Sequence, residues 1–204
     1  DEKVFALWQE NEDGTETELS DSIPDRIPSS SNTTISIVVP TDENGKYKPI
    51  LNKEENRLYA YLPLRDRRFK FHFYLNADFI LVSNREGVQG DNLWNQFLFY
   101  NIGKNLVSWI KQLASKEQPQ YLNLLQDELL PTEGEDLEDI QALSENFNRG
   151  YIGALLSEKF ILGHDEKLHS QDEVVYDESG LSKIIGPELF CQIVGTDKFL
   201  TYQT

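Results

Sequence analysis

Sulfur is scarce in this sequence: its 204 residues include one cysteine, Cys191, and no methionine. A lone cysteine excludes a disulfide framework within the chain and a metal site built from several thiolates. Such low cysteine usage fits a reducing compartment, and we expect a cytoplasmic location. Because the chain begins at Asp1 and has no methionine, we also expect it to be a fragment of a longer protein.

Two further absences concern membranes and secretion. No apolar run approaches the roughly 20 residues that an α-helix needs to span a bilayer. No signal peptide is recognisable near the first residue. We therefore do not expect a membrane to be a partner of this chain.

Basic residues are outnumbered by acidic ones, 19 against 35, and the formal net charge is −16. A field of that sign repels nucleic acid and anionic lipid, so neither is an expected partner. The acidic residues concentrate in three segments: residues 1–21, 127–145 and 165–178. Basic residues form one dense run, which is either a solvated strand face or a local anion site: Arg65, Arg67, Arg68 and Lys70.

The familiar catalytic motifs are missing as well. The sequence contains neither G-x-G-x-x-G nor G-x-x-x-x-G-K-[ST], so it lacks the loops that cradle nucleotide phosphates. No Ser or Cys stands in a recognisable nucleophile context. His164 and His169 lie in a stretch of Asp, Glu and Ser, which favours a solvated loop over a weak metal site with Asp165 or Asp172. We therefore expect no metal centre.

Alternating hydrophobicity predicts strands in the first half of the chain. The clearest pattern runs from Phe69 to Leu75, where apolar residues alternate with Lys70, His72 and Tyr74. A period of two buries one face of a strand and leaves the other more polar. Polar residues 10–34 are expected to form a loop with one short element. Shorter strands are predicted at four further places: residues 1–9, 35–40, 58–64 and 79–82.

A period close to four predicts helices in the second half. Asp91 is the expected N-cap of a helix from about residue 92 to 114. Its apolar stripe is wide enough to pack on a sheet, and it comprises Trp94, Leu98, Ile102, Leu106 and Ile110. Two more amphipathic helices are expected at residues 120–130 and about 136–159. The second contains Gly150, to which we assign no phosphate-binding role.

These elements predict an α+β chain, an α/β sandwich in which a mixed β-sheet packs on a long helix. Three parts are expected: a sandwich domain at residues 1–115, a helical segment at 116–159, and at 160–204 either a small mixed module or the start of the next domain. Within the last part, β-like pieces are predicted at residues 160–162, 173–176 and 190–194, with a short helix near 181–185.

The turn Asn84-Arg85-Glu86 carries the most suggestive side chain. An arginine at the end of an apolar strand, just before a helix, is held by rigid elements and can point into a cleft. Such an arginine suits a phosphate or a carboxylate. The alternative is a structural ion pair of Arg85 with Asp78, Glu86 or Asp91.

Residues 58–110 resemble the middle domain of GHKL-type ATPases, specifically of heat-shock protein 90 chaperones. That family has a loop of the form L-N-[IL]-S-R-E-x-L-Q, followed by a long helix with R-K-N-[IL]-V-K-K. Here the loop reads ILVSNREGVQ and the helix includes IGKNLVSWI. Asn84 stands where the family has a small hydroxyl residue, and Gly87 stands where it has a larger one.

The same stretch resembles a looser group still more closely: large sacsin-like and related bacterial proteins that carry a heat-shock-90-like ATPase module. That group uses an L-P…F-x-[IL]-N-A-x-F-x-L…R pattern ahead of a W-N helix. The matching residues here are Leu62, Pro63, Phe73, Asn76, Ala77, Phe79, Leu81, Arg85, Trp94 and Asn95.

The resemblance implies one half of a split ATPase site. In the family, the loop arginine reaches the γ-phosphate of ATP bound by the preceding domain, and the loop glutamine assists; these positions are Arg85 and Gln89. The pocket motifs N-E-x-x-D-[AN] and D-x-G-x-G are absent, so ATP and Mg would be held by that missing N-terminal domain. Supporting or domain-interface roles would fall to Asn84, Glu86, Arg65, Arg67 and Arg68.

The implied parent is a chaperone-like or defence-type multidomain protein, whose expected partners are its own N-terminal ATPase domain and a protein client. The alternative is an interaction or scaffold module of the same fold with no catalytic part. A stand-alone hydrolase is favoured least, because no nucleophile or metal set is visible.

Overall fold

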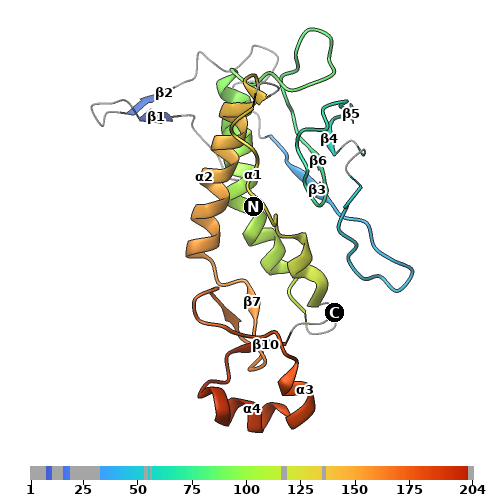
Figure 1. Ribbon diagram of the computed structural model, residues 1–204. Coiled ribbons are helices and arrows are strands. Elements are labelled where there is room, and N and C mark those ends of the chain that lie inside the picture. Colours follow the sequence, from blue (N-terminus) through green and yellow to red (C-terminus); the bar gives the residue numbers. More distant parts are fainter. Residues whose placement is uncertain are drawn as a thin grey trace.

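The computed structural model describes residues 8–10, 16–18, 33–52, 55, 57–115, 119–134 and 137–201. These residues form an α+β structure with small sheets and two long packed helices, as the sequence predicts (Figure 1). The short element expected around Ile23 to Ile27, and most of the strand expected at residues 1–9, lie outside the described residues.

The largest sheet is mixed and has the order β3-β6-β4-β5. Its central strand β6 (Tyr74–Asn76) runs antiparallel to β3 (Ser36–Val38) and parallel to β4 (Leu58–Ala60). The edge strand β5 (Leu62–Pro63) returns antiparallel to β4 through a tight turn. A separate antiparallel pair is formed by β1 (Trp8–Glu10) and β2 (Glu16–Glu18).

The alternation between Phe69 and Leu75 is confirmed in the burial of the side chains. The four apolar residues of odd number are all buried, whereas Lys70 is exposed and His72 and Tyr74 are half-buried. Only the end of this run is hydrogen-bonded to neighbouring strands, as part of β6. The alternating pattern therefore predicts which face is buried better than it predicts how long the strand is. Phe71 contacts Phe73 and Phe147, with ring centroids 5.2 and 5.1 Å apart.

Helices α1 (Leu93–Gln112) and α2 (Gln141–Ser157) lie side by side and pack against one face of this sheet (Figure 1). The backbones of the two helices approach closely at two glycines. A Cβ on Gly103 would lie 2.2 Å from the Phe147 carbonyl oxygen, and one on Gly150 would lie 2.2 Å from the Tyr100 carbonyl oxygen. Gly150 is therefore a packing residue at the helix crossing.

The N-cap of α1 is Asn92 and not Asp91. The Asn92 side-chain oxygen accepts hydrogen bonds from the backbone N–H groups of Trp94 and Asn95. Both Asp and Asn make good N-caps, and the sequence alone does not separate two neighbouring candidates. The Trp94 indole N–H also donates to the Asp78 carbonyl oxygen, 2.9 Å away, and fixes the start of the helix against the chain that precedes it.

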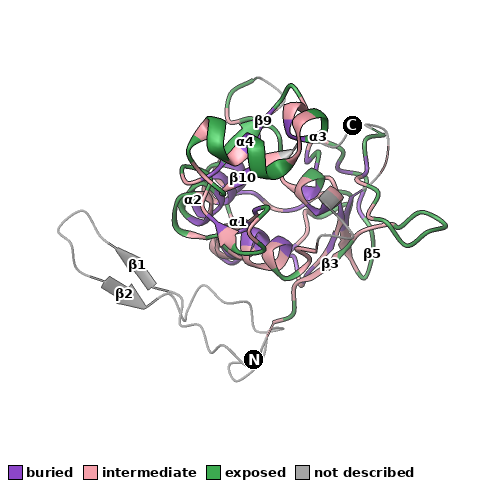
Figure 2. Ribbon diagram, turned by 90° about the horizontal axis from the view of Figure 1, so that it is seen from below, coloured by how far each residue is buried: buried purple, intermediate pink, exposed green. Residues whose placement is uncertain are grey.

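The hydrophobic core lies between the sheet and the two helices, and Figure 2 shows its buried residues gathered there. One continuous cluster extends from Leu58 to Val174. It therefore includes residues from each of the three parts expected from the sequence, and the boundaries near residues 115 and 159 stay a prediction. Among the described residues, no helix has both the length and the apolar character needed to cross a membrane.

Residues 160–201 form a small module of short elements below the helices (Figure 1). Strands β7 (Ile161–Leu162) and β8 (Leu168–His169) pair antiparallel, while β9 (Val175–Asp177) pairs parallel with β10 (Phe199–Thr201). Between β9 and β10 lie helix α3 (Leu181–Ile185), at the predicted place, and helix α4 (Pro187–Val194).

Three further local predictions are wrong. The strand expected at residues 79–82 is reduced to one isolated β-bridge, between Leu81 and Val88. The strand expected at residues 190–194 lies in helix α4, which has Pro187 at its start and Gly195 in a left-handed conformation at its end. The helix expected at residues 120–130 is reduced to the 3₁₀ helix η2 (Pro119–Leu124). There the Tyr121 hydroxyl donates to the Phe160 carbonyl oxygen and accepts from the Leu162 N–H, so tertiary bonds fix the segment.

Candidate functional site

The segment around Arg85 forms a short hairpin-like loop, closed by a bridge between Leu81 and Val88. Inside it the Val82 N–H donates to the Gly87 carbonyl oxygen at 3.1 Å, and the Arg85 N–H donates to the Val82 carbonyl oxygen at 2.8 Å. Arg85 has a φ of 60°, in the left-handed region that non-glycine residues rarely occupy. The backbone therefore turns sharply at this residue and presents its side chain outward.

Asn95, in the first turn of α1, holds the base of this loop. Its buried side-chain amide donates to the Ile80 and Gln89 carbonyl oxygens at 2.7 and 2.8 Å, and its oxygen accepts from the Ile80 N–H at 2.9 Å. One side chain thus bridges the chain entering the loop and the chain leaving it. Because buried polar groups are costly to leave unpaired, this arrangement fixes the loop to the helix.

A pocket of about 360 Å³ lies beside the loop, between three segments that are distant in sequence. Its walls come from the basic run, the loop and the approach to α2, and its lining residues are Arg65, Asp66, Arg67, Arg68, Val82, Asn84, Glu86, Gly87, Val88 and Asp139. The sequence analysis selected Asn84, Glu86 and the three arginines, and the structure brings these together. Arg85 and Gln89 are not among the lining residues.

The basic run is tied to the loop by paired backbone and side-chain contacts. The Arg65 N–H donates to the Glu86 carbonyl oxygen at 3.0 Å, and its guanidinium lies 2.8 Å from the Glu86 carboxylate. Both side chains are largely exposed, so solvent screens this pair and it contributes little to stability. The contact holds the basic run and the loop, which form two walls of the pocket, next to each other.

Arg68 is the best-paired cation of the pocket. It holds the buried Asp66 carboxylate through two guanidinium nitrogens at 2.9 and 2.8 Å, and it also contacts Asp139. The Asp66 carboxylate, and then Asp139, raise the pKa of Arg68 above its usual range. Gly90 packs against the same region, since a Cβ there would lie 1.6 Å from the Asp139 carbonyl oxygen. Arg68 and Gly90 therefore hold the approach to α2 against the loop.

Arg85 is exposed, and no residue that the structure describes forms a hydrogen bond or ion pair with its guanidinium. Two of the three carboxylates expected to pair with it bind other groups. Asp78 accepts hydrogen bonds from Thr33 and Tyr61, and Glu86 binds Arg65. The structure thus contains no ion pair of Arg85 within its described part. Gln89 contributes backbone contacts: its N–H donates to Ile80 and its carbonyl accepts from Asn95.

Two residues that shape the site were missed by sequence reasoning. Asn95 was noted only as part of a motif, and its clamp role depends on the geometry of the loop base. Asp139 was hidden in an acidic segment, 71 residues from its partner Arg68. The only available signal was a basic run and an acidic run of opposite charge, which does not specify individual pairs.

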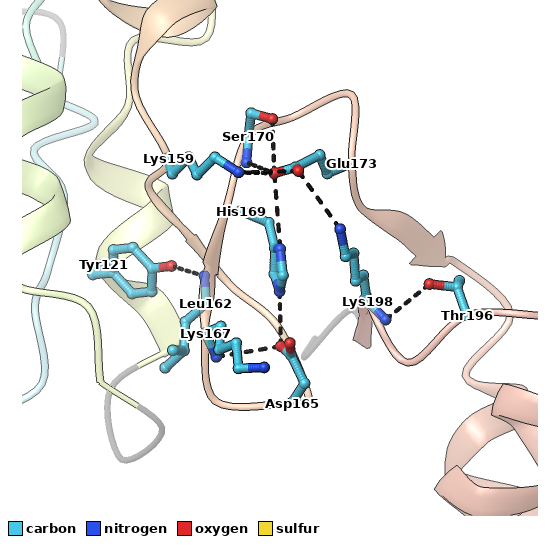
Figure 3. Close-up of polar contacts among 10 residues, drawn as sticks. All are labelled: Tyr121, Lys159, Leu162, Asp165, Lys167, His169, Ser170, Glu173, Thr196 and Lys198. Atoms are coloured by element: carbon cyan, nitrogen blue, oxygen red, sulfur yellow. Dashed lines mark hydrogen bonds and ion pairs between the residues drawn. The ribbon is translucent and has the colours of Figure 1, made fainter.

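The tail module contains a second polar cluster, drawn in Figure 3, which we call the tail network: Lys159, Asp165, His169, Ser170, Glu173 and Lys198. His169 lies at its centre with only 5% of its side chain exposed. Its Nε2 is 2.8 Å from an Asp165 oxygen and its Nδ1 is 3.8 Å from a Glu173 oxygen. The stretch expected to be a solvated loop is therefore an ordered, paired cluster.

Charge pairing in the tail network is extensive. Lys159 contacts both Glu173 oxygens, at 3.0 and 2.8 Å, and Lys198 approaches the same carboxylate at 3.5 Å. The Lys159 ammonium and then the Ser170 N–H lower the pKa of Glu173 to about 2. Burial alone would raise the pKa of Asp165, but hydrogen bonds from His169 and the Lys167 N–H lower it. The described residues include no group of three metal-ligating side chains.

Comparison with known proteins gives one informative likeness. A segment is 43% identical over 73 residues to Protein NO VEIN of Arabidopsis thaliana, covering 36% of this chain and 2% of that protein. The chain thus corresponds to a very small part of its relative's length. No protein-family model matches the chain, and no solved structure gives a significant match.

Proposed function

We propose that this chain is the middle region of a multidomain, heat-shock-90-like ATPase, in which Arg85 acts on ATP bound by a preceding domain. The observation that carries the proposal is an exposed arginine with no partner among the described residues, held at a strained turn beside a pocket rich in arginine. ATP and Mg would be bound by the preceding domain.

The pairing around the pocket supports this division of roles. Arg68 is committed to Asp66 and Asp139, and Arg65 is committed to Glu86. Arg85 keeps its charge available for an external anion. The chain carries a net charge of −16, so unpaired carboxylates near Arg85 would bind its guanidinium in place of an external anion. Arg85 can therefore bind an external anion only where the neighbouring carboxylates already have other partners.

The chemistry of phosphoryl transfer gives such an arginine a role. Negative charge spreads over the transferred phosphoryl group in the transition state, and a guanidinium placed there stabilises it. When the arginine comes from another domain, hydrolysis depends on closure of the two domains. In this proposal Arg85 binds the γ-phosphate oxygens, and the Asn95 clamp fixes the turn from which Arg85 projects.

Gln89 and Asn84 support the turn in different ways. The Asn84 side-chain oxygen accepts from the Glu86 N–H at 3.0 Å, which stabilises the turn on either side of Arg85. Gln89 lies at the loop exit, where its backbone is bound by Asn95. We propose that its side chain assists Arg85 at the phosphate after domain closure.

A second candidate is a non-catalytic interaction or scaffold module of the same fold. It is favoured by the exposed apolar and aromatic residues on the outer face of the sheet, among them Val38, Tyr61 and Leu62. In this alternative, Arg85 binds an acidic group of a partner domain without acting on a phosphate.

Hydrolysis of ATP by a longer form of the protein, which includes the preceding domain, separates the two. We expect Arg85→Ala to lower the rate at least about tenfold, because inter-domain arginines of this kind contribute roughly 10³–10⁵. Binding of ATP, measured separately, should change little. The matched control is Arg149→Ala, since Arg149 is an exposed arginine of α2 that contacts Asn146 and does not line the pocket.

The outcomes discriminate clearly. A large loss for Arg85→Ala alone supports the split site. An unchanged rate in Arg85→Ala, or no hydrolysis even in the unsubstituted protein, overturns it and leaves the scaffold alternative.

A further inference from the structure

The outer face of the main sheet carries a second pocket, of about 430 Å³, whose walls are mostly aromatic and apolar. It is lined by Ser36, Val38, Tyr59, Tyr61, Tyr74, Leu75 and Asn76. The strand register explains this grouping. Val38 pairs with Tyr74 and Ser36 with Asn76, while Tyr59 pairs with Asn76 from the other side, so their side chains share the face turned away from α1.

The tyrosine rings of this pocket have an arrangement suited to a cation. The rings of Tyr59 and Tyr74 stand at 86° to each other, with centroids 5.9 Å apart. Tyr61 follows β4 and is 83% exposed. All three rings line this pocket, and an open aromatic ring face carries the negative side of the quadrupole, which attracts a cation.

Acidic groups at the margin hold two of these rings. The Tyr61 hydroxyl donates to an Asp78 carboxylate oxygen at 3.0 Å, and the Tyr74 hydroxyl donates to Glu55. The hydrogen bond to Glu55 is the main cause that raises the pKa of Tyr74 to about 12, so this hydroxyl stays a donor at neutral pH. These bonds direct each hydroxyl towards an acid at the margin, and they place two carboxylates close to the pocket.

The backbone at Tyr61 adds a further constraint. Its φ is 65°, a conformation that a large aromatic residue rarely adopts, and its N–H donates to the Asn76 side-chain oxygen at 3.0 Å. An exposed aromatic ring is thus held in a strained turn by bonds on both its backbone and its hydroxyl. Backbone strain of this kind is concentrated at functional positions.

We propose that this pocket, which we call the tyrosine pocket, binds a lysine or arginine side chain presented by an extended segment of a partner protein. Charge complementarity selects this occupant. None of the lining residues is basic, Glu55 and Asp78 lie at the margin, and the chain as a whole carries a net charge of −16. Arg57 lies close enough to Tyr74 to lower the pKa of that hydroxyl, but it is buried and its guanidinium donates to the Asn52 carbonyl oxygen. This inference does not depend on the proposed ATPase role of Arg85.

The test uses this chain without nucleotide and a capped pentapeptide, acetyl-Gly-Val-Lys-Val-Gly-amide, as the probe. Binding is followed by the backbone amide NMR shifts of the protein. Matched peptides carry norleucine or glutamate in place of lysine. We expect the lysine peptide to shift amides of β3, β4 and β6, and to bind at least about threefold tighter than the norleucine peptide, as an exposed cation–π contact would produce.

Substitutions at Tyr61 separate ring chemistry from simple bulk. Tyr61→Leu should remove most of the preference for lysine over norleucine, whereas Tyr61→Phe, which keeps the ring, should retain it. Tyr176→Leu is the matched control, because Tyr176 is an exposed tyrosine of the tail module. Equal binding of the lysine and norleucine peptides, shifts confined to other elements, or an unchanged preference in Tyr61→Leu would overturn the proposal. The amide spectrum of each variant shows directly that it is folded.

Discussion

The pocket beside Arg85 and the tail network are both clusters of charged side chains, but they differ in how completely their charges are paired. In the tail network, Glu173 binds Lys159 and Lys198, and His169 lies between two carboxylates. In the walls of the pocket, Arg65 and Arg68 are paired with carboxylates, while Arg85, beside the pocket, forms no ion pair with a described residue. Ion pairs that are partly shielded from solvent stabilise a fold modestly, whereas an exposed cation without an ion-pair partner loses no such contact when it is removed.

Arg85 and His169 also differ in how the structure holds them in place. Arg85 is positioned by backbone bonds and by the Asn95 clamp, so its side chain is free although its turn is fixed. His169 is positioned by its own side-chain contacts. An arginine without an ion-pair partner on a rigid turn is suited to binding an external anion. A cluster whose charged side chains pair with one another is suited to holding β7, β8 and β9 together.

The largest effect on stability is expected at the crossing of α1 and α2. Gly150→Ala places a Cβ against the Tyr100 carbonyl oxygen, and backbone cannot move aside as a flexible side chain can. We expect the free energy of unfolding, measured in urea, to fall by about 3 kcal/mol.

Gly153→Ala is the matched control in the same helix. No atom lies within 4 Å of its added Cβ, so it should stabilise by about 0.5–1 kcal/mol through helix propensity. If both variants behaved alike, the close approach of the helices would be wrong.

The next effect concerns the frame of the pocket. Asn95→Ala removes the partner of the Ile80 N–H and of the Gln89 carbonyl oxygen, while the Ile80 carbonyl oxygen keeps its bond from the Gln89 N–H. We expect a loss of about 2–3 kcal/mol in urea unfolding. Asn105→Ala is the control, because Asn105 bonds only to a carbonyl oxygen within its own helix. Amide exchange at Gln89 should also become faster in Asn95→Ala. Equal effects from the two asparagines would contradict the clamp.

The smallest of these effects tests the tail network through pH. The pKa of Glu173 is about 2 in the folded chain and near 4.5 when unperturbed, so folding favours its ionised form. This stabilisation is present above about pH 4.5 and is lost as the pH falls towards 2. The melting temperature of Glu173→Gln should therefore lie below that of the unsubstituted chain at pH 6, and the gap should close at low pH. A gap that stays constant down to pH 3 would exclude this pairing.

The sequence predicted the fold correctly where the spacing of apolar residues within a single element decides which of its faces is buried. The alternation from Phe69 to Leu75 and the stripe along α1 both survive in the structure, because each face is set by side-chain periodicity alone. The prediction failed at residues 190–194, where aromatic and branched residues suggested a strand. The capping signals there, Pro187 and Gly195, were visible in the sequence and outweigh the composition.

The candidate site was predictable only in part, for a related reason. The motif around Arg85 and the basic run could be selected from sequence, and they do lie together. Asp139 and the burial of His169 could not, because both depend on contacts between distant segments that no local pattern encodes. The tyrosine pocket likewise arises from strand register, which places Val38 beside Tyr74 although 36 positions separate them.

The most direct test of the account places both regions in one experiment. In a longer form of the protein with its preceding domain, ATP hydrolysis and melting temperature are measured for Arg85→Ala and Glu173→Gln. We predict that Arg85→Ala loses at least about tenfold in rate and keeps its melting temperature, while Glu173→Gln keeps its rate and melts earlier. An Arg85→Ala variant that hydrolyses ATP normally, or that melts as early as Glu173→Gln, would contradict the central claim.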